Sequence, residues 1–231
     1  MVKTINEDGS YDVYLYNSDN NLIKILYKDK DGNDLTYYRD YQYTGTDMTT
    51  YTFFDDGTAT ERIDLVYNDG KLVKSTLYID QGSGLNEFWI VYYTYSGDKI
   101  SNLVFKADIG SGYEVMFKQN FIWNGSNVSR VEELADSSGV LVPDGYTAYT
   151  YDDNRNPFNN IGLNDIYGDP NDMSANNIIE EKAYKTNGDL IESLSYDNSY
   201  EYNTNDYPTK FTQVSKDGLS TEVITAEYEV K

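Results

Sequence analysis

The chain has 231 residues, of which 25 are tyrosine, no cysteine or histidine, and a formal charge of −21. This acidity argues against nucleic acids and anionic lipid surfaces as partners, because phosphate groups are bound by clustered lysine and arginine. Without cysteine and histidine the chain has no disulfides, no thiolate chemistry, and neither the commonest general base nor the commonest zinc ligand.

In chain order, residues 1–10 form a polar lead-in that we expect to be flexible, and β-type apolar alternation begins at Tyr11. A tight turn at Pro143-Asp144-Gly145 is also expected, ahead of the strand at 146–151. The alternation predicts strands at 11–16, 22–27, 35–43, 49–54, 59–67, 72–79, 88–95, 100–107, 113–123, 128–134, 146–151, 178–184, 190–196, 200–202, 211–214 and 223–230.

One strand–turn–strand pattern recurs at a nearly constant spacing. An aromatic-x-aromatic pair precedes a polar turn, and its second aromatic is Tyr67, Tyr95, Trp123 and then Tyr151, in three steps of 28 residues. A second series of turns, such as Gly82-Ser83-Gly84, lies between the copies. One period therefore holds two strands and two turns, which predicts consecutive β-hairpins in a repeat architecture.

The repeat pattern is interrupted at residues 156–177, a segment that contains Pro157 and Pro170 and apolar residues without strand periodicity. This composition predicts a long inserted loop packed on the sheet, with a short helical turn. We expect residues 11–231 to form one all-β domain: a large, curved, up-and-down antiparallel meander or partly closed barrel of about 14–16 strands. A four-bladed propeller is less favoured, because the internal similarity is between hairpins and not between blades.

The repeats resemble two groups of proteins. The aromatic units are similar to the tyrosine-aspartate (RHS-type) repeats of large bacterial surface and toxin proteins, with the dipeptide itself at Tyr151-Asp152 and Tyr196-Asp197. The hairpin series, Asn156-Pro157-Phe158 and the strand reopening at 174–178 resemble Bacteroidetes exported lipoprotein domains of unknown function, which have a porin-like antiparallel sheet. This resemblance implies an envelope location, in the periplasm or at the outer-membrane surface, and a lipid anchor outside this sequence.

Sites for metals, cofactors or catalysis are not apparent. Residues 29–34 have the composition of a calcium loop but not its spacing, so we expect a hairpin turn there. Adjacent acidic pairs such as Glu180-Glu181 place their carboxylates on opposite faces of a strand, so no pair alone can serve glycoside hydrolysis. Carboxylates from different strands could still converge.

These features favour a non-enzymatic exported or surface-attached module that binds a glycan, peptide or partner protein, or serves as a spacer. The candidate binding residues are aromatic, since exposed aromatic patches mark interaction sites: Trp89, Tyr93, Tyr95, Phe121, Trp123, Tyr149, Tyr151, Phe158 and Tyr167. Two alternatives remain. One is a carboxylate-based glycoside hydrolase, and the other is an outer-membrane barrel. The barrel is less favoured because charged residues lie within predicted strands, at Lys106, Glu114 and Lys118. No helical segment of membrane-spanning length is visible.

Overall fold

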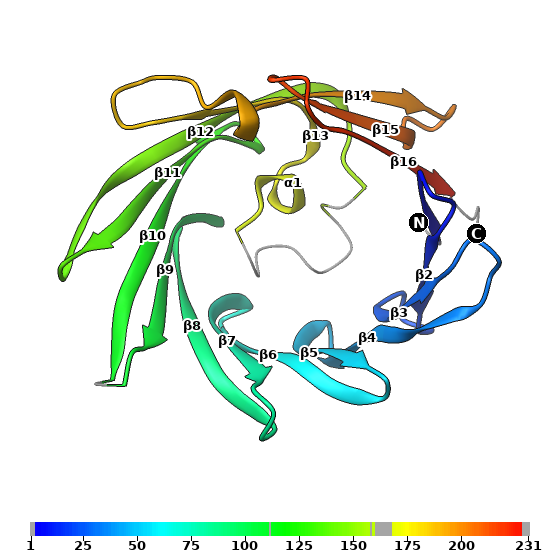
Figure 1. Ribbon diagram of the computed structural model, residues 1–231, viewed down its shortest axis with the longest axis horizontal. Coiled ribbons are helices and arrows are strands. Elements are labelled where there is room, and N and C mark those ends of the chain that lie inside the picture. Colours follow the sequence, from blue (N-terminus) through cyan, green and yellow to red (C-terminus); the bar gives the residue numbers. More distant parts are fainter. Residues whose placement is uncertain (1–2, 111, 158, 160–167, 228–231) are drawn as a thin grey trace. The chain divides into compact units, whose positions relative to one another are not determined.

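The computed structural model describes residues 3–110, 112–157, 159 and 168–227 (Figure 1). Within these residues the chain is mostly strand, and the named helical elements are one α-helix and one 3₁₀-helix. The elements are β1 (Lys3–Asn6), β2 (Tyr11–Tyr16), β3 (Leu22–Lys28), β4 (Asp34–Thr44), β5 (Asp47–Asp55), β6 (Thr58–Asn68), β7 (Lys71–Asp80), β8 (Leu85–Ser96), β9 (Lys99–Asp108), β10 (Tyr113–Asn124), β11 (Asn127–Ser137), β12 (Val140–Arg155), α1 (Pro170–Met173), β13 (Asn176–Tyr184), η2 (Glu192–Leu194), β14 (Tyr196–Tyr202), β15 (Pro208–Ser215) and β16 (Thr221–Glu227).

The strand order is that of an up-and-down antiparallel barrel, in which each strand is hydrogen-bonded to its neighbours in sequence and β1 to β16. The predicted fold class is therefore confirmed. The chain divides into two compact units, which we describe separately. Unit 1 comprises residues 1–93, 105–114 and 226–231, and unit 2 comprises residues 94–104 and 115–225.

Alternation along the strands of unit 1 separates an apolar face from a polar one. The turns fix the register of this alternation. Asp56-Gly57 and Asp69-Gly70 each have positive φ at both residues, between 47° and 74°, as a two-residue type I′ turn requires. The buried residues on the apolar face come from successive strands and include Leu22, Ile25, Tyr41, Met48, Tyr51, Ile63, Leu65, Leu72, Leu77, Val91 and Tyr93.

Unit 2 has the same construction. Its pairs β10–β11, β11–β12, β12–β13, β13–β14, β14–β15 and β15–β16 are all antiparallel. Its buried apolar residues are Ile100, Leu103, Phe121, Val128, Val131, Met173, Ile178 and Ala183.

The turn predicted at Pro143-Asp144-Gly145 is wrong, because β12 runs straight through it. The register shifts there, with Glu133 opposite Gly145 and Leu134 opposite Pro143, so the three residues form a bulge. Gly145 has φ +133°, and a Cβ at this position would lie 2.4 Å from the Tyr184 carbonyl oxygen. A bulge therefore accommodates the proline and glycine that suggested a turn.

Two further stretches differ from the sequence-based expectation. The strand predicted at 190–196 is wrong: Leu190 forms one isolated bridge, η2 follows, and β14 begins at Tyr196. Ser195 explains the change, because its hydroxyl accepts from the Ala183 N–H at 3.0 Å and donates to the Ile191 carbonyl at 2.8 Å, replacing ladder bonds. Residues 1–10, which we expect to be a flexible lead-in, contain a strand: β1 pairs with β2 in antiparallel orientation.

The described part of the inserted loop, residues 168–175, lies on the sheet of unit 2 (Figure 1), and we call it the strap. It contains α1, so the predicted helical turn is confirmed. A Cβ at Gly168 would lie 2.5 Å from Leu103 Cδ1 and 3.0 Å from Phe121 Cζ, so the strap backbone rests directly on these core side chains. Within the described residues, no helix has the length and hydropathy needed to cross a membrane.

Candidate binding face

One face of unit 2 collects tyrosine, carboxyl and amide groups from three strands. Tyr149 and Tyr151 lie two residues apart on β12, and Glu181 of β13 is the register partner of Tyr149. Asn198 and Tyr200 of β14 lie on the same side, since the Asn198 amide approaches Glu181 Oε1 at 3.4 Å. We call these five residues the tyrosine face.

Hydrogen bonds hold the rings of this face in place. The Tyr151 hydroxyl donates to the Val128 carbonyl at 2.6 Å and accepts from Ser174 Oγ of the strap at 2.9 Å. The Tyr200 hydroxyl donates to the Ile178 carbonyl at 3.0 Å. All three rings are half-buried, so each keeps part of its surface open, and these hydrogen bonds fix the orientations of Tyr151 and Tyr200.

Two carboxyl groups that are separate in sequence, those of Glu181 and Asp169, act electrostatically on each other's surroundings and on these rings. Burial raises the pKa of Glu181, the hydrogen bond from Asn198 opposes this shift, and the charge of Asp169 adds to it. The protein packed around Asp169 raises the pKa of its carboxyl as well, although solvent reaches the side chain. Asp169 also caps α1 by accepting from the Asn171 N–H at 2.8 Å. A carboxyl with a raised pKa can donate a hydrogen bond to a hydroxyl group when it is protonated and accept one when it is ionised.

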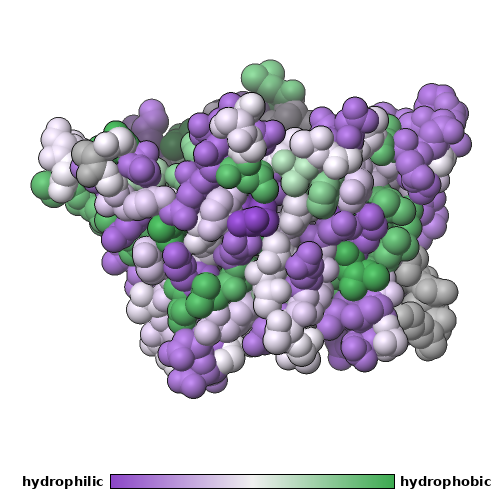
Figure 2. Space-filling model, turned by 90° about the horizontal axis from the view of Figure 1, so that it is seen from below, coloured by the Kyte–Doolittle hydropathy of each residue, from purple (hydrophilic) through white to green (hydrophobic). Residues whose placement is uncertain are grey.

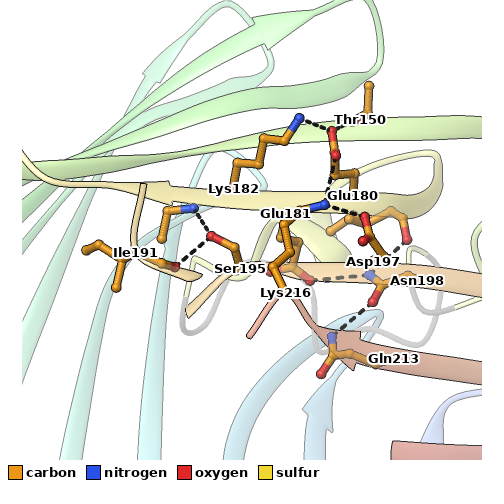
Figure 3. A network of polar contacts seen from close by, with 12 residues as sticks. Thr150, Glu180, Glu181, Lys182, Ile191, Ser195, Asp197, Asn198, Gln213 and Lys216 are labelled. Carbon is orange, nitrogen blue, oxygen red and sulfur yellow. Dashed lines mark hydrogen bonds and ion pairs between the residues drawn. The ribbon is translucent and has the colours of Figure 1, made fainter. Parts of the chain in front are cut away.

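The opposite face of the same strands is charged (Figure 3). Lys216 bridges Glu180 at 3.1 Å and Asp197 at 2.5 Å, and Lys182 pairs with Glu180 at 2.8 Å. The hydrogen bond from Lys182 is the main cause of the lowered pKa of Glu180. Adjacent Glu180 and Glu181 thus point to opposite faces, as strand geometry predicted, and their pKa values move in opposite directions.

The aromatic residues predicted from sequence fall into different environments. Tyr93 and Phe121 are each 6% exposed, so they belong to the core and not to an open surface. Tyr93 shares a hydrogen bond of 2.8 Å with Ser75 Oγ, and Phe121 lies under Gly168. Trp89 is half-buried in unit 1, where its ring meets Phe105 edge-on at 6.0 Å.

The remaining predicted residues belong to unit 2 or are not described. Trp123 donates its indole N–H to the Ile100 carbonyl at 2.7 Å, with Lys99 Nζ 5.1 Å from its ring centre. Tyr95 is half-buried on β8. Phe158 and Tyr167 lie outside the described residues. Of the predicted set, the structure therefore brings Tyr149 and Tyr151 together with the converging polar groups.

Sequence reasoning missed Asp169, Asn198 and Tyr200, and it considered Glu181 only as half of an adjacent pair. The alternation of β13 could have assigned Glu181 to the face of Tyr149. No sequence signal places Asp169 there, because its position depends on the path of the strap.

The predicted hairpin turn between β3 and β4 is present. The Asp29 carboxylate accepts from the N–H groups of Asp31 and Asn33, both at 2.9 Å, so it serves the turn itself. In the part of the chain that the structure describes, no three acidic side chains gather as a metal site.

Comparisons with known proteins identify the fold. The structure is similar to a porin-like protein from Bacteroides vulgatus, with a TM-score of 0.66 and 13% identity over 99% of this chain and 98% of that one. A porin-like protein from Bacteroides uniformis matches with a TM-score of 0.61 and 11% identity over 98% and 96%. No protein-family model and no curated protein matches the sequence. The chain therefore has a porin-like fold.

Proposed function

We propose that this protein is a non-enzymatic binding module of the bacterial cell envelope and that it binds a glycan on the tyrosine face of unit 2. One observation carries the proposal: half-exposed rings and hydrogen-bonding side chains from β12, β13 and β14 meet on one face.

Sugar rings have apolar C–H faces and hydroxyl edges. The rings of Tyr149 and Tyr200 offer apolar area, and Glu181 offers carboxylate acceptors beside them, positioned by the buried Asn198. Because Tyr151 and Tyr200 are already fixed by hydrogen bonds to the backbone, little side-chain entropy is lost when a ligand binds.

The envelope location rests on two supports. The porin-like neighbours come from Bacteroides species, and the hairpin repeats resemble exported lipoprotein domains. A lipid anchor outside this sequence is part of the proposal.

The test is a glycan array followed by calorimetric titration of any hit. Tyr149→Ala should weaken binding, because it removes a ring of the face. Tyr146→Ala is the matched control: Tyr146 is on the same strand but stacks on Tyr184 at 4.8 Å and lies 3.7 Å from the Arg130 guanidinium, on the charged side. Absence of any glycan ligand, or equal loss in both variants, would overturn the proposal.

A second candidate function is glycoside hydrolysis, favoured by the electrostatic effect of Asp169 on Glu181. A carboxyl with a raised pKa can act as a general acid, and such a reaction needs a second carboxyl near it. Release of reducing ends from a bound glycan would support it, provided that Glu181→Gln stops turnover while binding remains. Binding without turnover supports the non-enzymatic module.

The outer-membrane barrel is less favoured because of the charged face of unit 2. Lipid-facing strands carry an apolar band, whereas ion pairs lie mid-strand here, at Arg130–Glu132 (3.0 Å) on β11 and Lys182–Glu180 (2.8 Å) on β13. On the face drawn in Figure 2, hydrophobic residues form small separate patches among hydrophilic ones. Extraction only in detergent would reverse this preference.

A further inference from the structure

We propose that unit 1 carries a second ligand site, a pocket between two neighbouring turns that binds a neutral monosaccharide unit. The pocket has a volume of about 410 Å³. Its lining residues come from the β1–β2 turn, the β3–β4 turn and β4: Asp8, Ser10, Asp29, Lys30, Leu35 and Tyr37. The pocket shares no residue with the tyrosine face, so the proposal stands independently of that site.

Two similar turns form the rim and hold each other in place. In the first, the Gly9 N–H donates to the Asn6 carbonyl at 3.0 Å, and in the second the Gly32 N–H donates to the Asp29 carbonyl at 3.1 Å. Gly9 has φ +84°, and a Cβ there would lie 3.3 Å from Lys30 Cβ, so the turns are in close contact. The rim is thus built before any ligand arrives.

One wall of the pocket is the ring of Tyr37, which is 36% exposed. The ring is supported by Tyr27, with centroids 5.0 Å apart, and by Phe53 at 6.0 Å. Leu35 lies on the same side of β4, two residues earlier. A supported ring with an apolar neighbour suits the C–H face of a pyranose.

The polar groups of the pocket suit hydroxyl ligands. Hydrogen bonds hold the pKa of Asp8 and of Asp29 below the usual range, so both are ionised at neutral pH. Asp8 accepts both of its bonds from Ser10, at 2.9 and 2.6 Å, through Oδ1. A carboxylate has about four acceptor positions, and O–H···O⁻ bonds are stronger than neutral ones, so acceptor capacity remains for a sugar hydroxyl.

The charges exclude an anionic ligand. Two carboxylates line the pocket, and the ammonium of Lys30 lies 3.1 Å from Asp31, which balances its charge. The pocket therefore offers acceptors and an aromatic wall to a hydroxylated ligand, and the comparison with glucosamine tests whether a positive charge adds to binding.

The experiment is a two-dimensional amide NMR titration of the whole chain. The probes are glucose, galactose and N-acetylglucosamine, with glucosamine and glucuronate as cationic and anionic counterparts. We expect a neutral sugar to shift the amides of residues 8–10 and 29–37. Tyr37→Ala should weaken binding by about tenfold or more. The matched control is Tyr38→Ala on the opposite face of β4, where the ring stacks on Phe54 at 4.7 Å, and it should bind as the unmodified chain does.

Three outcomes would overturn the proposal: no amide shifts in this region with any neutral sugar, preference for glucosamine or glucuronate, or unchanged binding by Tyr37→Ala. Titration of Tyr149→Ala separates the two proposals, since this variant leaves the pocket intact and alters only the tyrosine face.

Discussion

The indole N–H of Trp123 donates a hydrogen bond to the carbonyl oxygen of Ile100 at 2.7 Å, 23 residues earlier in the chain. The same relationship joins the Tyr151 hydroxyl to the Val128 carbonyl at 2.6 Å, again across 23 residues. Ile100 and Val128 are each the second residue of the strand that follows one aromatic pair, and the next aromatic pair supplies the donor. The 28-residue period therefore corresponds to a repeated contact that ties each hairpin to the preceding one.

Replacing Trp123 by Phe should destabilise the protein by about 1 kcal/mol, because an apolar ring remains but the Ile100 carbonyl loses its donor. Tyr151→Phe should lower the free energy of unfolding by at least the same amount, since Ser174 Oγ also loses a hydrogen-bond partner. Urea midpoints with unchanged m-values provide the measurement. Tyr146→Phe keeps the stack on Tyr184 and should be near neutral. Equal midpoints for all three variants would show that these bonds contribute nothing.

Gly168→Ala should destabilise the protein more than Gly218→Ala. The two glycines have nearly the same φ, +70° and +71°, so the backbone strain of the substitution is matched. A Cβ at Gly218 meets nothing within 4 Å, whereas at Gly168 it would collide with Leu103. We expect Gly218→Ala to cost about 1 kcal/mol and Gly168→Ala to exceed it by a further 1–3 kcal/mol, the range for overpacking. Similar losses in both variants would mean that the strap does not rest on Leu103.

Glu181→Gln should stabilise the protein at pH 7. The folded-state pKa of Glu181 is raised above 4.5, so its protonated form favours folding and its contribution is lost as pH rises through the folded pKa. The variant removes the ionised form, and its advantage over the unmodified chain should shrink as pH falls through the folded pKa and be absent below 4.5. Thermal unfolding at pH 7 and pH 4 checks both statements.

The neighbouring Glu180→Gln should behave in the opposite way. The folded-state pKa of Glu180 is lowered, so it contributes stability above 4.5 that is lost as pH falls through the folded pKa. This variant should be less stable at pH 7, and the difference should disappear near the folded pKa. If both variants shift stability in the same direction, the assignment of the two carboxyls to opposite environments is wrong.

Asp152→Asn should loosen the start of β13. The Asp152 carboxylate accepts from the N–H groups of Asn154 and Asn177, at 3.0 and 3.1 Å, and from the Tyr202 hydroxyl. In the variant, an amide NH₂ group replaces one carboxylate oxygen and faces these donors without being able to accept from them. The free energy of unfolding should fall by about 1–3 kcal/mol. Hydrogen exchange should then accelerate at residues 174–178. Asp153→Asn, one residue later and exposed, is the control and should leave exchange unchanged.

Local chemistry explains why most strands could be located from sequence. Apolar alternation together with Asp-Gly turns such as Asp69-Gly70 specifies where a strand starts, which face it buries and where it reverses. The errors occurred where a single residue allowed a different local structure from the one that the pattern predicts. Gly145 allowed a bulge in place of a turn, and Ser195 supplied hydrogen bonds that a ladder would otherwise provide.

The sequence by itself determined the hairpin repeat, its 28-residue period and the antiparallel order, because these depend on contacts between neighbouring segments. Only the tertiary structure decided which aromatics remain open, and it placed Asp169 within electrostatic range of Glu181. The position of Asp169 depends on the path of the strap across the sheet, which is set by packing such as that of Gly168 on Leu103. A periodic pattern encodes repeated neighbour contacts, but one irregular segment has no period from which its endpoint can be inferred.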